Sequence, residues 1–592
     1  MNSFKAKAKA QHNIDTHDPI TVTYRHILTT NITNKHPLRV VALVDSDAFY
    51  AACEMVRLGV DRETPLVVMQ WSSFIAVNYP ARKYGISRFG KDLVSVEEAR
   101  KRCPELRVVH VATYKEGQAE PGYFDKPDPL THKVSLDYYR RESKKIHQLI
   151  ADSVPAGTSE RASIDEAFID FTRAVLDVML ERWPHLSKPP QDDMDSALPT
   201  PPPINWDGLG HLIPSNDGVE DPEAFDHETT WHDVALSIAA ELMDNIRKEI
   251  DSRFGYTTSA GLAKNKFLAK LCASYKKPNS QSILRNTAIV GYLQPLPFQK
   301  IRFLGGKLGQ AISEEFEAAT VGDLLSIGLG ELQSKFGDNA IWVYELMRGI
   351  DRSEVKERPD QTKSMLASKN LPKPITRPGE GQHWIRVLAA ELALRLREAR
   401  AETPGLWPKS IVLHARKGYE SSRSRQAPFP FVQDATVDVI AAAGDKLWKE
   451  LVGVSWTDKT KVSSLQLSFT GIATQETGQQ NIEGFFGSRK RKRTEEEDVE
   501  KALDDAHDVG FSEFTCERCS KNIKIPWGGK EEEMQAQAIR VEHEDFHFAM
   551  DLAKSADMAT AAPSKRPDSR SKTTAASSKP QGKGIEKFFK RR

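Results

Sequence analysis

Hydrophobic and polar positions alternate with strand-like and helix-like spacing along most of the chain. The stretch LRVVALVDSD predicts a strand at Val40 to Val44, and further strand and helix patterns follow to about Thr470. In WHDVALSIAAELMDNIRKEIDSRFG, an apolar stripe that ends before Gly255 predicts an amphipathic helix. The apolar positions of this stripe are Ala235, Ile238, Ala239, Leu242, Ile246 and Ile250. The chain is therefore expected to form mixed α and β domains.

Three stretches depart from this pattern. Residues 188–228 are rich in proline and acidic residues, which predicts an exposed insertion outside the core. Residues 1–37 predict a disordered arm, with a mitochondrial targeting segment as the alternative. From about residue 473, short motifs are separated by charged or Ala-, Ser- and Lys-rich linker, which predicts a largely disordered tail.

Composition sets the outer limits of the interpretation. The 592 residues suffice for about three to five domains, and 39% of them are hydrophobic. The net charge of +1 indicates no class of partner by itself. No run is long and apolar enough to cross a membrane. The cysteines are too few and odd in number for a disulfide framework, which favours a reducing compartment; they are Cys53, Cys103, Cys272, Cys516 and Cys519.

Two adjacent acidic residues, Asp165 and Glu166, lie between two strand-like halves of ERASIDEAFID. Neighbouring residues of a strand point to opposite faces, so the two can share an ion only at or near a turn. The flanks RASI and AFIDF predict a hairpin with the pair at or beside its tip, and Asp45 at the end of VVALV offers a third carboxylate. Such oxygen ligands suit Mg²⁺, and paired Mg²⁺ ions serve phosphoryl transfer. Taken alone, the pair could also be the solvated tip of a hairpin.

Five segments together closely resemble the Y family of translesion DNA polymerases, in its eta branch. They are VVALVDSDAFYAACE, IAVNYPARKYGISR, ERASIDEAFID, TSAGLAKNKFLAKLCASYKKPN and IRFLGGKLG, and the resemblance covers about residues 39–475. It implies an α+β right-hand polymerase with palm, fingers and thumb, an added little-finger domain, and a largely disordered tail with a small zinc finger. The implied divisions are palm at 38–49 and 111–285, fingers at 50–110, thumb at 286–360, little finger at 361–473, linker at 474–510, zinc finger at 511–556 and basic tail at 557–592.

The resemblance also implies the catalytic residues. Asp45, Asp165 and Glu166 would be the palm carboxylates that bind two Mg²⁺ ions, for which Mn²⁺ could substitute. The backbone carbonyl of Ser46 would be a further ligand. Asp47 lies in the same motif, but members of the family vary at this position, so no role is assigned to it.

Nucleotide and DNA contacts follow from the same resemblance. Phe49 and Tyr50 begin a helix whose first N–H groups suit phosphate, and Tyr50 resembles the steric gate that excludes a ribonucleotide, with core packing as the alternative. The further nucleotide contacts implied are Tyr79, Arg82, Arg88 and Lys277. The template and primer contacts implied are Gln70, Lys270, and the helix–hairpin–helix residues Gly305, Gly306 and Lys307. The loop after Gln70 is shorter than in the relatives.

The segment that resembles the little finger begins at KSMLASKNLP and ends at VSSLQLSFTG. A long helix through IRVLAAELALRLREAR and the strand SIVLHAR lie between them. Lys363, Lys369 and Arg423 are candidates for contacts to template phosphates, or each is simply a solvated surface charge.

The tail carries two clamp-binding patterns and a basic run. QQNIEGFF matches Q-x-x-I-x-x-F-F, which predicts binding to the sliding clamp PCNA; its defining residues are Gln479, Ile482, Phe485 and Phe486. The end, GIEKFFKRR, repeats Ile585, Phe588 and Phe589 but has Gly582 in place of glutamine. SRKRKR at 488–493 predicts nuclear import, or supports the neighbouring box electrostatically.

The tail also contains two cysteines and two histidines at metal-ligand spacing. CERC and HEDFH supply four nitrogen and sulfur ligands for a structural Zn²⁺ ion; these are Cys516, Cys519, His543 and His547. The 23-residue gap between the pairs is long for a ββα finger. The helix EHEDFHFAMDLAK resembles a ubiquitin-binding zinc finger, with Asp545 and Phe548 toward ubiquitin. A DNA-reading finger is the alternative, against which the acidity of the helix argues.

Together these features predict a monomeric, nuclear, Y-family polymerase that inserts nucleotides opposite damaged, ultraviolet-type template bases. Its expected partners are primer–template DNA, dNTPs, PCNA and ubiquitin, without a membrane. One alternative is another Y-family branch, against which Arg88 and the zinc ligands argue. The other is a clamp and ubiquitin adaptor with an inactive polymerase domain, against which the intact acidic trio argues.

Overall fold

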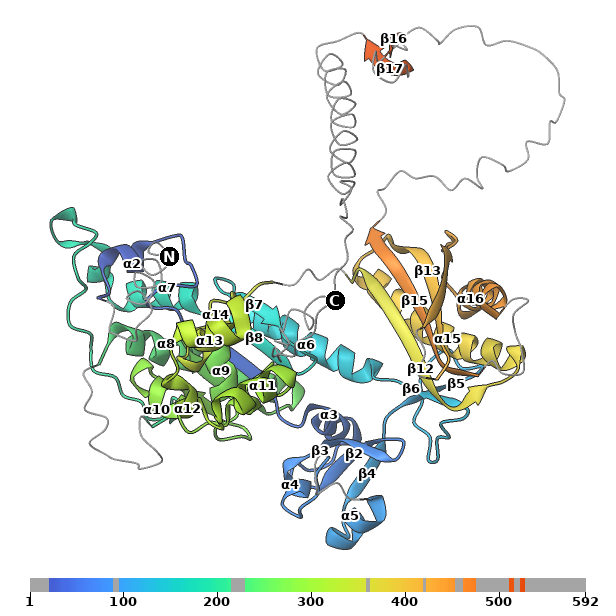
Figure 1. Ribbon diagram of the computed structural model, residues 1–592, viewed down its shortest axis with the longest axis horizontal. Coiled ribbons are helices and arrows are strands. Elements are labelled where there is room, and N and C mark those ends of the chain that lie inside the picture. Colours follow the sequence, from blue (N-terminus) through green and yellow to red (C-terminus); the bar gives the residue numbers. More distant parts are fainter. Residues whose placement is uncertain are drawn as a thin grey trace, which may run out of the picture. The chain divides into compact units, whose positions relative to one another are not determined.

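The computed structural model forms two compact units, residues 1–481 and residues 482–592 (Figure 1). It describes residues 21–88, 95–214, 229–357, 362–418, 422–452, 461–474, 510–515 and 522–527.

The first unit contains a central six-stranded sheet with the order β7-β8-β1-β10-β11-β9. In that order the strands are Thr158–Arg161, Glu166–Asp170, Val41–Ser46, Thr258–Ala263, Gln281–Ile283 and His211–Leu212. Strand β1 pairs antiparallel with both β8 and β10, so it lies in the middle of the sheet. The helices around this sheet are α3 (Phe49–Leu58), α6 (Asp137–Ser153), α7 (Thr172–Arg182), α8 (Trp231–Phe254) and α9 (Lys266–Cys272).

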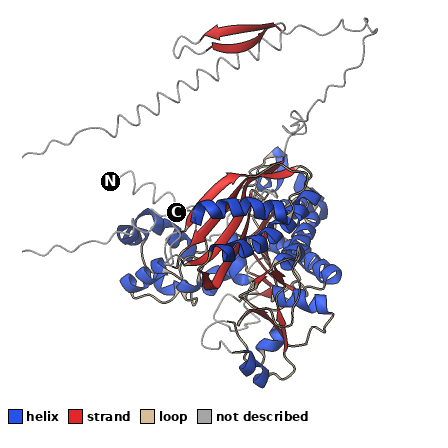
Figure 2. Ribbon diagram, turned by 90° about the vertical axis from the view of Figure 1, so that its right-hand side faces the viewer, coloured by secondary structure: helices blue, strands red, loops and turns tan. Residues whose placement is uncertain are grey.

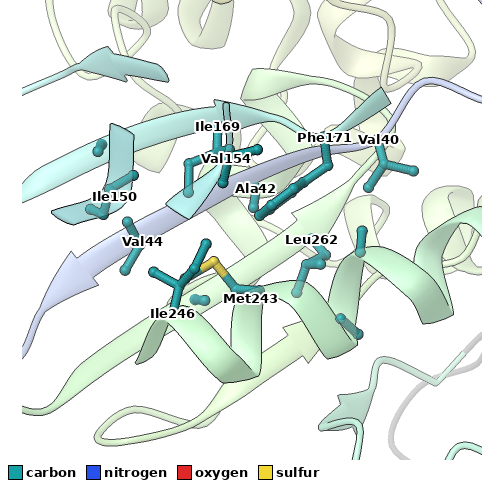
Figure 3. Close-up of a cluster of buried hydrophobic side chains, with 14 of the residues drawn as sticks. Val40, Ala42, Val44, Ile150, Val154, Ile169, Phe171, Met243, Ile246 and Leu262 are labelled. Carbon is teal, nitrogen blue, oxygen red and sulfur yellow. The ribbon is translucent and has the colours of Figure 1, made fainter. Parts of the chain in front are cut away.

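The main core lies between this sheet and helix α8. Side chains of β1 alternate between the two faces, and Ala42 and Val44 point toward Met243 and Ile246 of α8 (Figure 3). Helix α8 begins with a capping box at Thr230 and ends where Gly255 takes a left-handed conformation, as glycine readily does. The predicted strand and the predicted amphipathic helix are both confirmed.

The prediction of a disordered arm over residues 1–37 is wrong for residues 21–37. Helix α2 (Tyr24–Leu28) buries the side chains of Tyr24 and Ile27 in the main core. Its backbone is held by residues far along the chain, since Tyr24 N–H donates to Ser196 O at 3.2 Å. Residues 1–20 lie outside the described residues.

The prediction of an exposed insertion at 188–228 is confirmed for most of its described residues, which are exposed, and is wrong only where the segment packs on the central sheet. Leu198 and Ile213 are buried, and β9 adds the sixth strand to the central sheet by pairing parallel with β11. The short 3₁₀ helices η2 (Pro184–Ser187) and η3 (Pro190–Asp192) flank its start. Prolines limit helix and strand hydrogen bonding, but they do not prevent neighbouring apolar side chains from packing. Residues 215–228 lie outside the described residues.

A smaller three-stranded sheet with the order β3-β2-β4 follows helix α3. Its strands are β2 (Leu66–Gln70), β3 (Ser73–Val77) and β4 (Arg107–His110), and its helices are α4 (Tyr79–Arg82) and α5 (Val96–Arg102). This small sheet has a separate core. The hairpin β5 (Thr113–Lys115) and β6 (His132–Val134) comes next in the chain and leads to α6.

Residues 286–350 form a helical segment of short helices. These are η5 (Asn286–Ala288), α10 (Ile289–Leu293), η6 (Phe298–Lys300), α11 (Lys307–Phe316), α12 (Val321–Leu325), α13 (Leu329–Phe336), η7 (Gly337–Asn339) and α14 (Ala340–Met347).

A four-stranded sheet with the order β12-β15-β13-β14 completes the first unit. Two helices lie across one face of this sheet (Figure 2), and they bury a second core. The strands are β12 (Ser364–Ile375), β13 (Leu406–Arg416), β14 (Arg423–Pro428) and β15 (Val462–Thr474), and the helices are α15 (Pro378–Glu402) and α16 (Val437–Val452). The long helix and the strands expected in this region are confirmed.

In the second unit, β16 (Gly510–Thr515) and β17 (Asn522–Trp527) form an antiparallel hairpin. Thr515 pairs with Asn522 at the inner end of this hairpin. In the described part of the chain, no helix combines the length and the apolar character that a membrane crossing requires.

Candidate active site

Three carboxylates lie near one another at one end of the paired strands β1 and β8 in the central sheet. Asp45 on β1 stands directly opposite Glu166, the first residue of β8, so both side chains lie on the same face of the sheet. Asp165 immediately precedes β8, and its carbonyl accepts a hydrogen bond from Ser46 N–H at 2.9 Å. The pair Asp165 and Glu166 therefore lies at the end of the β7–β8 hairpin, where the sequence predicted it.

Ser163 shapes the turn that presents this pair. Its hydroxyl donates to Asp165 Oδ1 at 2.5 Å and accepts from the N–H groups of Asp165 and Glu166 at 3.2 and 3.1 Å. Serine hydroxyls commonly hold a turn in this way. The sequence analysis gave Ser163 no role, although a serine two residues before an aspartate was the available signal.

Two lysines pair with these carboxylates. Lys277 Nζ lies 2.6 Å from Asp45 Oδ2, and Lys270 Nζ lies 2.6 Å from Glu166 Oε1. Burial raises the pKa of Asp45 to about 6, against the lowering effect of Lys277 and with a further increase from Glu166 and Asp165. The carboxylates therefore repel one another even with the lysines beside them, and further positive charge would be favourable here.

The donor set fits Mg²⁺ in its chemistry. It consists of carboxylate oxygens with a main-chain carbonyl nearby at Ser46, and Mg²⁺ prefers hard oxygen ligands. Among the described residues, no three acidic, histidine or cysteine side chains already converge as ligands around one point. In this arrangement Asp45 and Glu166 face the lysine ammonium groups instead.

Asp47, to which the sequence gave no role, holds the loop that carries Lys277. Its buried carboxylate accepts from Ser259 Oγ at 2.7 Å and from Asn279 N–H at 2.8 Å. Asn279 lies two residues beyond Lys277, so Asp47 holds the backbone of the loop that carries this lysine. This role depends on a contact between residues far apart in the chain, which the motif alone does not reveal.

Tyr50 lies beside the carboxylates at the start of helix α3. Its ring stacks on Tyr139 at a centroid distance of 4.4 Å, and Tyr139 is fixed by donating to Glu54 Oε1 at 2.7 Å. Burial raises the pKa of Tyr50, and the negative charge of Asp165 raises it further. The Tyr50 ring is therefore held in place next to the carboxylate of Asp165. Tyr139 supports this ring, and the sequence did not single it out.

The grouping of Phe49 with the nucleotide contacts requires a correction. Its side chain is only 3% exposed and packs edge-on against Tyr256 at 6.2 Å. The ring therefore belongs to the core, because a helix that follows a central strand must bury one face against the sheet. Only its main chain, at the first turn of α3, remains suited to a phosphate.

Tyr79 and Arg82 form a compact pair on the short helix α4. The guanidinium carbon of Arg82 lies 4.2 Å from the centre of the Tyr79 ring, and Arg82 Nε donates to Val77 O at 3.0 Å. The pKa of Tyr79 is raised by burial and by Asp47, while Arg82 and Lys277 lower it. Arg82 and Lys277 therefore both lie near Tyr79, while a shared role in binding a triphosphate stays a prediction. The side chain of Asn78 caps the helix by accepting from Ala81 N–H.

Gln70 and Arg88 are brought to the same hairpin of the small sheet. Gln70 ends β2 and pairs with Ser73, and Arg88 donates to Ile75 O on β3 at 2.7 Å. The hairpin turn consists of Trp71 and Ser72, which agrees with the short loop noted in the sequence.

Gly305, Gly306 and Lys307 form the entry to helix α11, with Gly306 as the residue before the helix. A Cβ at Gly309 would overlap the carbonyl oxygen of Leu304. Helix α11 can therefore pack this closely against the preceding turn, residues 301–306, only with glycine at position 309.

The suggestion that Lys369 contacts template phosphates is wrong in this structure. The side chain is 5% exposed, and its ammonium group donates to Pro129 O at 2.8 Å and His132 O at 2.7 Å. It also lies 4.7 and 4.8 Å from the ring centres of Trp71 and Trp384. Burial lowers its pKa to about 8. Lys363 and Arg423 are exposed.

The tail motifs fall almost entirely outside the described residues. This holds for both clamp-binding patterns, the basic run, the four zinc ligands and the ubiquitin-facing pair. The described hairpin β16–β17 directly flanks the CERC sequence, which occupies positions 516–519.

Known protein families match three segments of the chain. The impB/mucB/samB family matches residues 44–274, and its C-terminal domain matches residues 362–482. A motif described as DNApol eta/Rev1, HhH matches residues 296–350. DNA polymerase eta of Saccharomyces cerevisiae is 28% identical over 87% of this chain and 88% of its own length. The chain belongs to the Y family of DNA polymerases.

Two further relatives are similar to this chain, and one of them is again a DNA polymerase eta. DNA polymerase eta of Arabidopsis thaliana is 28% identical over 66% of this chain and 55% of its own length. The N-acetyltransferase eso1 of Schizosaccharomyces pombe is 38% identical over 77% of this chain. This chain spans about half the length of these two relatives, 51% of eso1 and 55% of the plant protein. The family and its relatives indicate a translesion DNA-directed DNA polymerase close to eta.

Proposed function

We propose that the chain extends primers past damaged template bases by metal-assisted nucleotidyl transfer. The observation that carries this proposal is the proximity of Asp45, Asp165 and Glu166 at one end of the paired strands β1 and β8, with Lys270 and Lys277 beside them. Separate parts of the chain converge there, which a solvated hairpin tip would not require.

The four parts of the first unit then take the roles of a right-hand polymerase. The central sheet is the palm, and the small sheet is the fingers. The helical segment at 286–350 belongs to the thumb, and the four-stranded sheet with helices α15 and α16 forms the little finger.

Residues of the chain bind and orient the incoming nucleotide. Two bound Mg²⁺ ions would stabilise the charge on the attacking primer oxygen and on the departing pyrophosphate. Lys277 and Arg82 bind the triphosphate, and the planar guanidinium of Arg82 matches phosphate geometry. Lys270 lies near the primer end. Most of the acceleration comes from positioning and from this fixed charge.

The lesion class is proposed from the eta-like fingers. Gln70 lies on the β2–β3 hairpin and Arg88 donates a hydrogen bond to Ile75 of the same hairpin, so the hairpin would help to position both the residue at the incoming base and the residue at the template base. An ultraviolet-type damaged template is the substrate this arrangement supports by its similarity to eta.

Recruitment is assigned to the tail. The clamp-binding box at 479–486 and the second motif at 585–589 bind PCNA. A Zn²⁺ ion held by CERC and HEDFH supports ubiquitin binding through Asp545 and Phe548. Hairpin β16–β17 favours a zinc finger of ββα type, because its strands flank the CERC sequence. The basic run at 488–493 directs the protein to the nucleus.

A running-start primer-extension assay tests this function. The full chain is given undamaged templates and templates with a single thymine dimer. We expect wild-type protein to extend through both, and Asp165→Ala and Glu166→Ala to bind primer–template DNA without extending it. Glu160→Gln is the matched control, because Glu160 also pairs with a lysine of α9, Lys266 at 2.7 Å, but on the neighbouring strand. This control is expected to remain active.

The assay also separates the alternatives. Extension that stops at the dimer would indicate another Y-family branch. A wild-type chain that extends neither template would indicate a clamp and ubiquitin adaptor. Normal extension by Asp165→Ala or Glu166→Ala would contradict the assignment of the metal ligands.

A further inference from the structure

Residues 301–306 form the turn between η6 and α11, which is the hairpin of the helix–hairpin–helix motif, and Phe303 lies in this turn. Its side chain is 70% exposed, the most exposed of the large hydrophobic side chains in the described part of the chain. Its backbone has a φ angle of +73°, in the left-handed region that bulky side chains rarely adopt. Neither feature favours folding, and strained conformations that persist often mark a functional position.

The neighbours of Phe303 extend it into a small apolar surface. Trp342 of α14 is also exposed, and its ring lies 6.3 Å from the Phe303 ring in an edge-to-face arrangement. Ile341, beside it on α14, is exposed as well. Ile301 and Leu304 on the same hairpin are buried. The hairpin is therefore anchored by its other apolar residues while Phe303 remains outside the core.

Positive charge lies on the Phe303 side of this surface, whereas the acidic residues Asp338 and Glu345 lie within four residues of Trp342 along the chain. The guanidinium of Arg302 lies 4.8 Å from the centre of the Phe303 ring. Lys300 and Lys307 lie on either side in the sequence, and residues 300–307 contain no acidic residue. A partner must therefore combine negative charge with apolar surface at short range. Duplex DNA does so, because its phosphates alternate with deoxyribose rings.

We propose that Phe303 and Trp342 form an apolar contact with the deoxyribose rings of the primer–template duplex, flanked by phosphate contacts from Arg302 and Lys307. This inference deepens the proposed function and rests on it. The hairpin would then hold DNA by two separate forces. The charged residues supply a part that weakens with salt, and the rings supply a part that does not.

The contact explains the strain at Phe303. The left-handed backbone turns the side chain out of the core while its neighbours Ile301 and Leu304 stay buried. An aromatic ring adds contact area without many rotatable bonds to immobilise. Comparable apolar side chains are used by other proteins that bind the grooves of DNA.

Equilibrium binding of the full chain to a fluorescent primer–template, measured over a range of salt concentrations, tests this proposal. We expect Phe303→Ser to weaken binding roughly five- to tenfold at every salt concentration, as expected for losing part of a buried aromatic side chain. The slope of log affinity against log salt should be unchanged. Lys307→Ala is the matched control on the same hairpin, and it should reduce that slope by about one.

A second variant separates the contact from the stability of the hairpin. Phe303→Gly removes both the ring and the backbone strain, so its thermal stability should equal or exceed that of wild type while its DNA binding is weakened like that of Phe303→Ser. Wild-type affinity in either variant would overturn the proposal, and so would a change of salt slope in Phe303→Ser. Absence of any salt-dependent duplex binding by the wild-type chain would instead remove the proposed function itself.

Discussion

The pKa of Asp45 reflects opposing effects of burial and of the charged residues around it. Burial and two neighbouring carboxylates raise its pKa, while Lys277 acts in the opposite direction. The proposed metal-binding role would account for this repulsion, because bound cations would offset it. The acidic pattern together with the resemblance to the Y family was enough to find the carboxylates, and the resemblance alone pointed to the lysines. Neither could find Ser163, Asp47 or Tyr139, because each of these residues acts through a neighbour that only the fold brings close.

Tyr50 is predicted to exclude ribonucleotides from the site. Tyr50→Ala should raise the efficiency of ribonucleotide insertion relative to deoxynucleotide insertion by on the order of tenfold or more, because a ring that blocks the 2′ position is lost. The ratio of kcat/KM for a matched rNTP and dNTP measures this effect. Tyr139→Phe keeps the stacked ring beneath Tyr50 and should leave the ratio nearly unchanged. An unchanged ratio in Tyr50→Ala would contradict the steric-gate role.

At the scale of elements, strong periodicity was a reliable guide and weak periodicity was not. Helices α8 and α15 and strands β13 and β15 follow from their apolar patterns, and strand β1 follows from its short apolar run. Helix α2 is too short for a period to appear, and it is held by distant backbone groups at 194–198. Strand β9 is similarly short and is fixed by pairing with β11. Composition predicted a disordered arm around α2 and an exposed insertion around β9, because composition does not report tertiary contacts.

Helix α2 is predicted to contribute to the stability of the first unit through Ile27. Ile27→Ala should lower the free energy of unfolding by about 2–4 kcal/mol, because Ile27 is fully buried in the main core and its loss leaves a cavity. Leu58→Ala removes an exposed side chain of α3 and should change stability little. Chemical denaturation followed by the signal of the first unit measures both. Equal stability of Ile27→Ala and wild type would show that α2 does not dock on the core in solution.

At the scale of the whole molecule, the polymerase elements and the tail motifs fall into different units of the chain. The proposed catalytic residues all lie within residues 1–481, and most of the tail motifs lie within residues 482–592. The proposed division assigns chemistry to the first and recruitment to the second, with the clamp-binding box at 479–486 at their boundary.

This division predicts separable effects. Phe485→Ala combined with Phe486→Ala should reduce binding to PCNA at least tenfold, because both rings of the clamp-binding box are lost. The same variant should extend primers on clamp-free templates at the wild-type rate. Phe588→Ala with Phe589→Ala measures the second motif under the same conditions. Loss of clamp-free extension in the first variant would contradict the separation.

The central claim is that Asp45, Asp165 and Glu166 jointly bind the metal ions of nucleotidyl transfer. The most direct test counts Mn²⁺ ions bound to the full chain by electron paramagnetic resonance, with a dideoxy-terminated primer–template and the matching dNTP present. We predict that, after subtraction of the ions bound by DNA and nucleotide alone, about two ions are retained per complex, and that Asp165→Ala loses at least one of them while DNA binding persists. An ion count that is the same in wild type and in a variant lacking all three carboxylates would contradict the account.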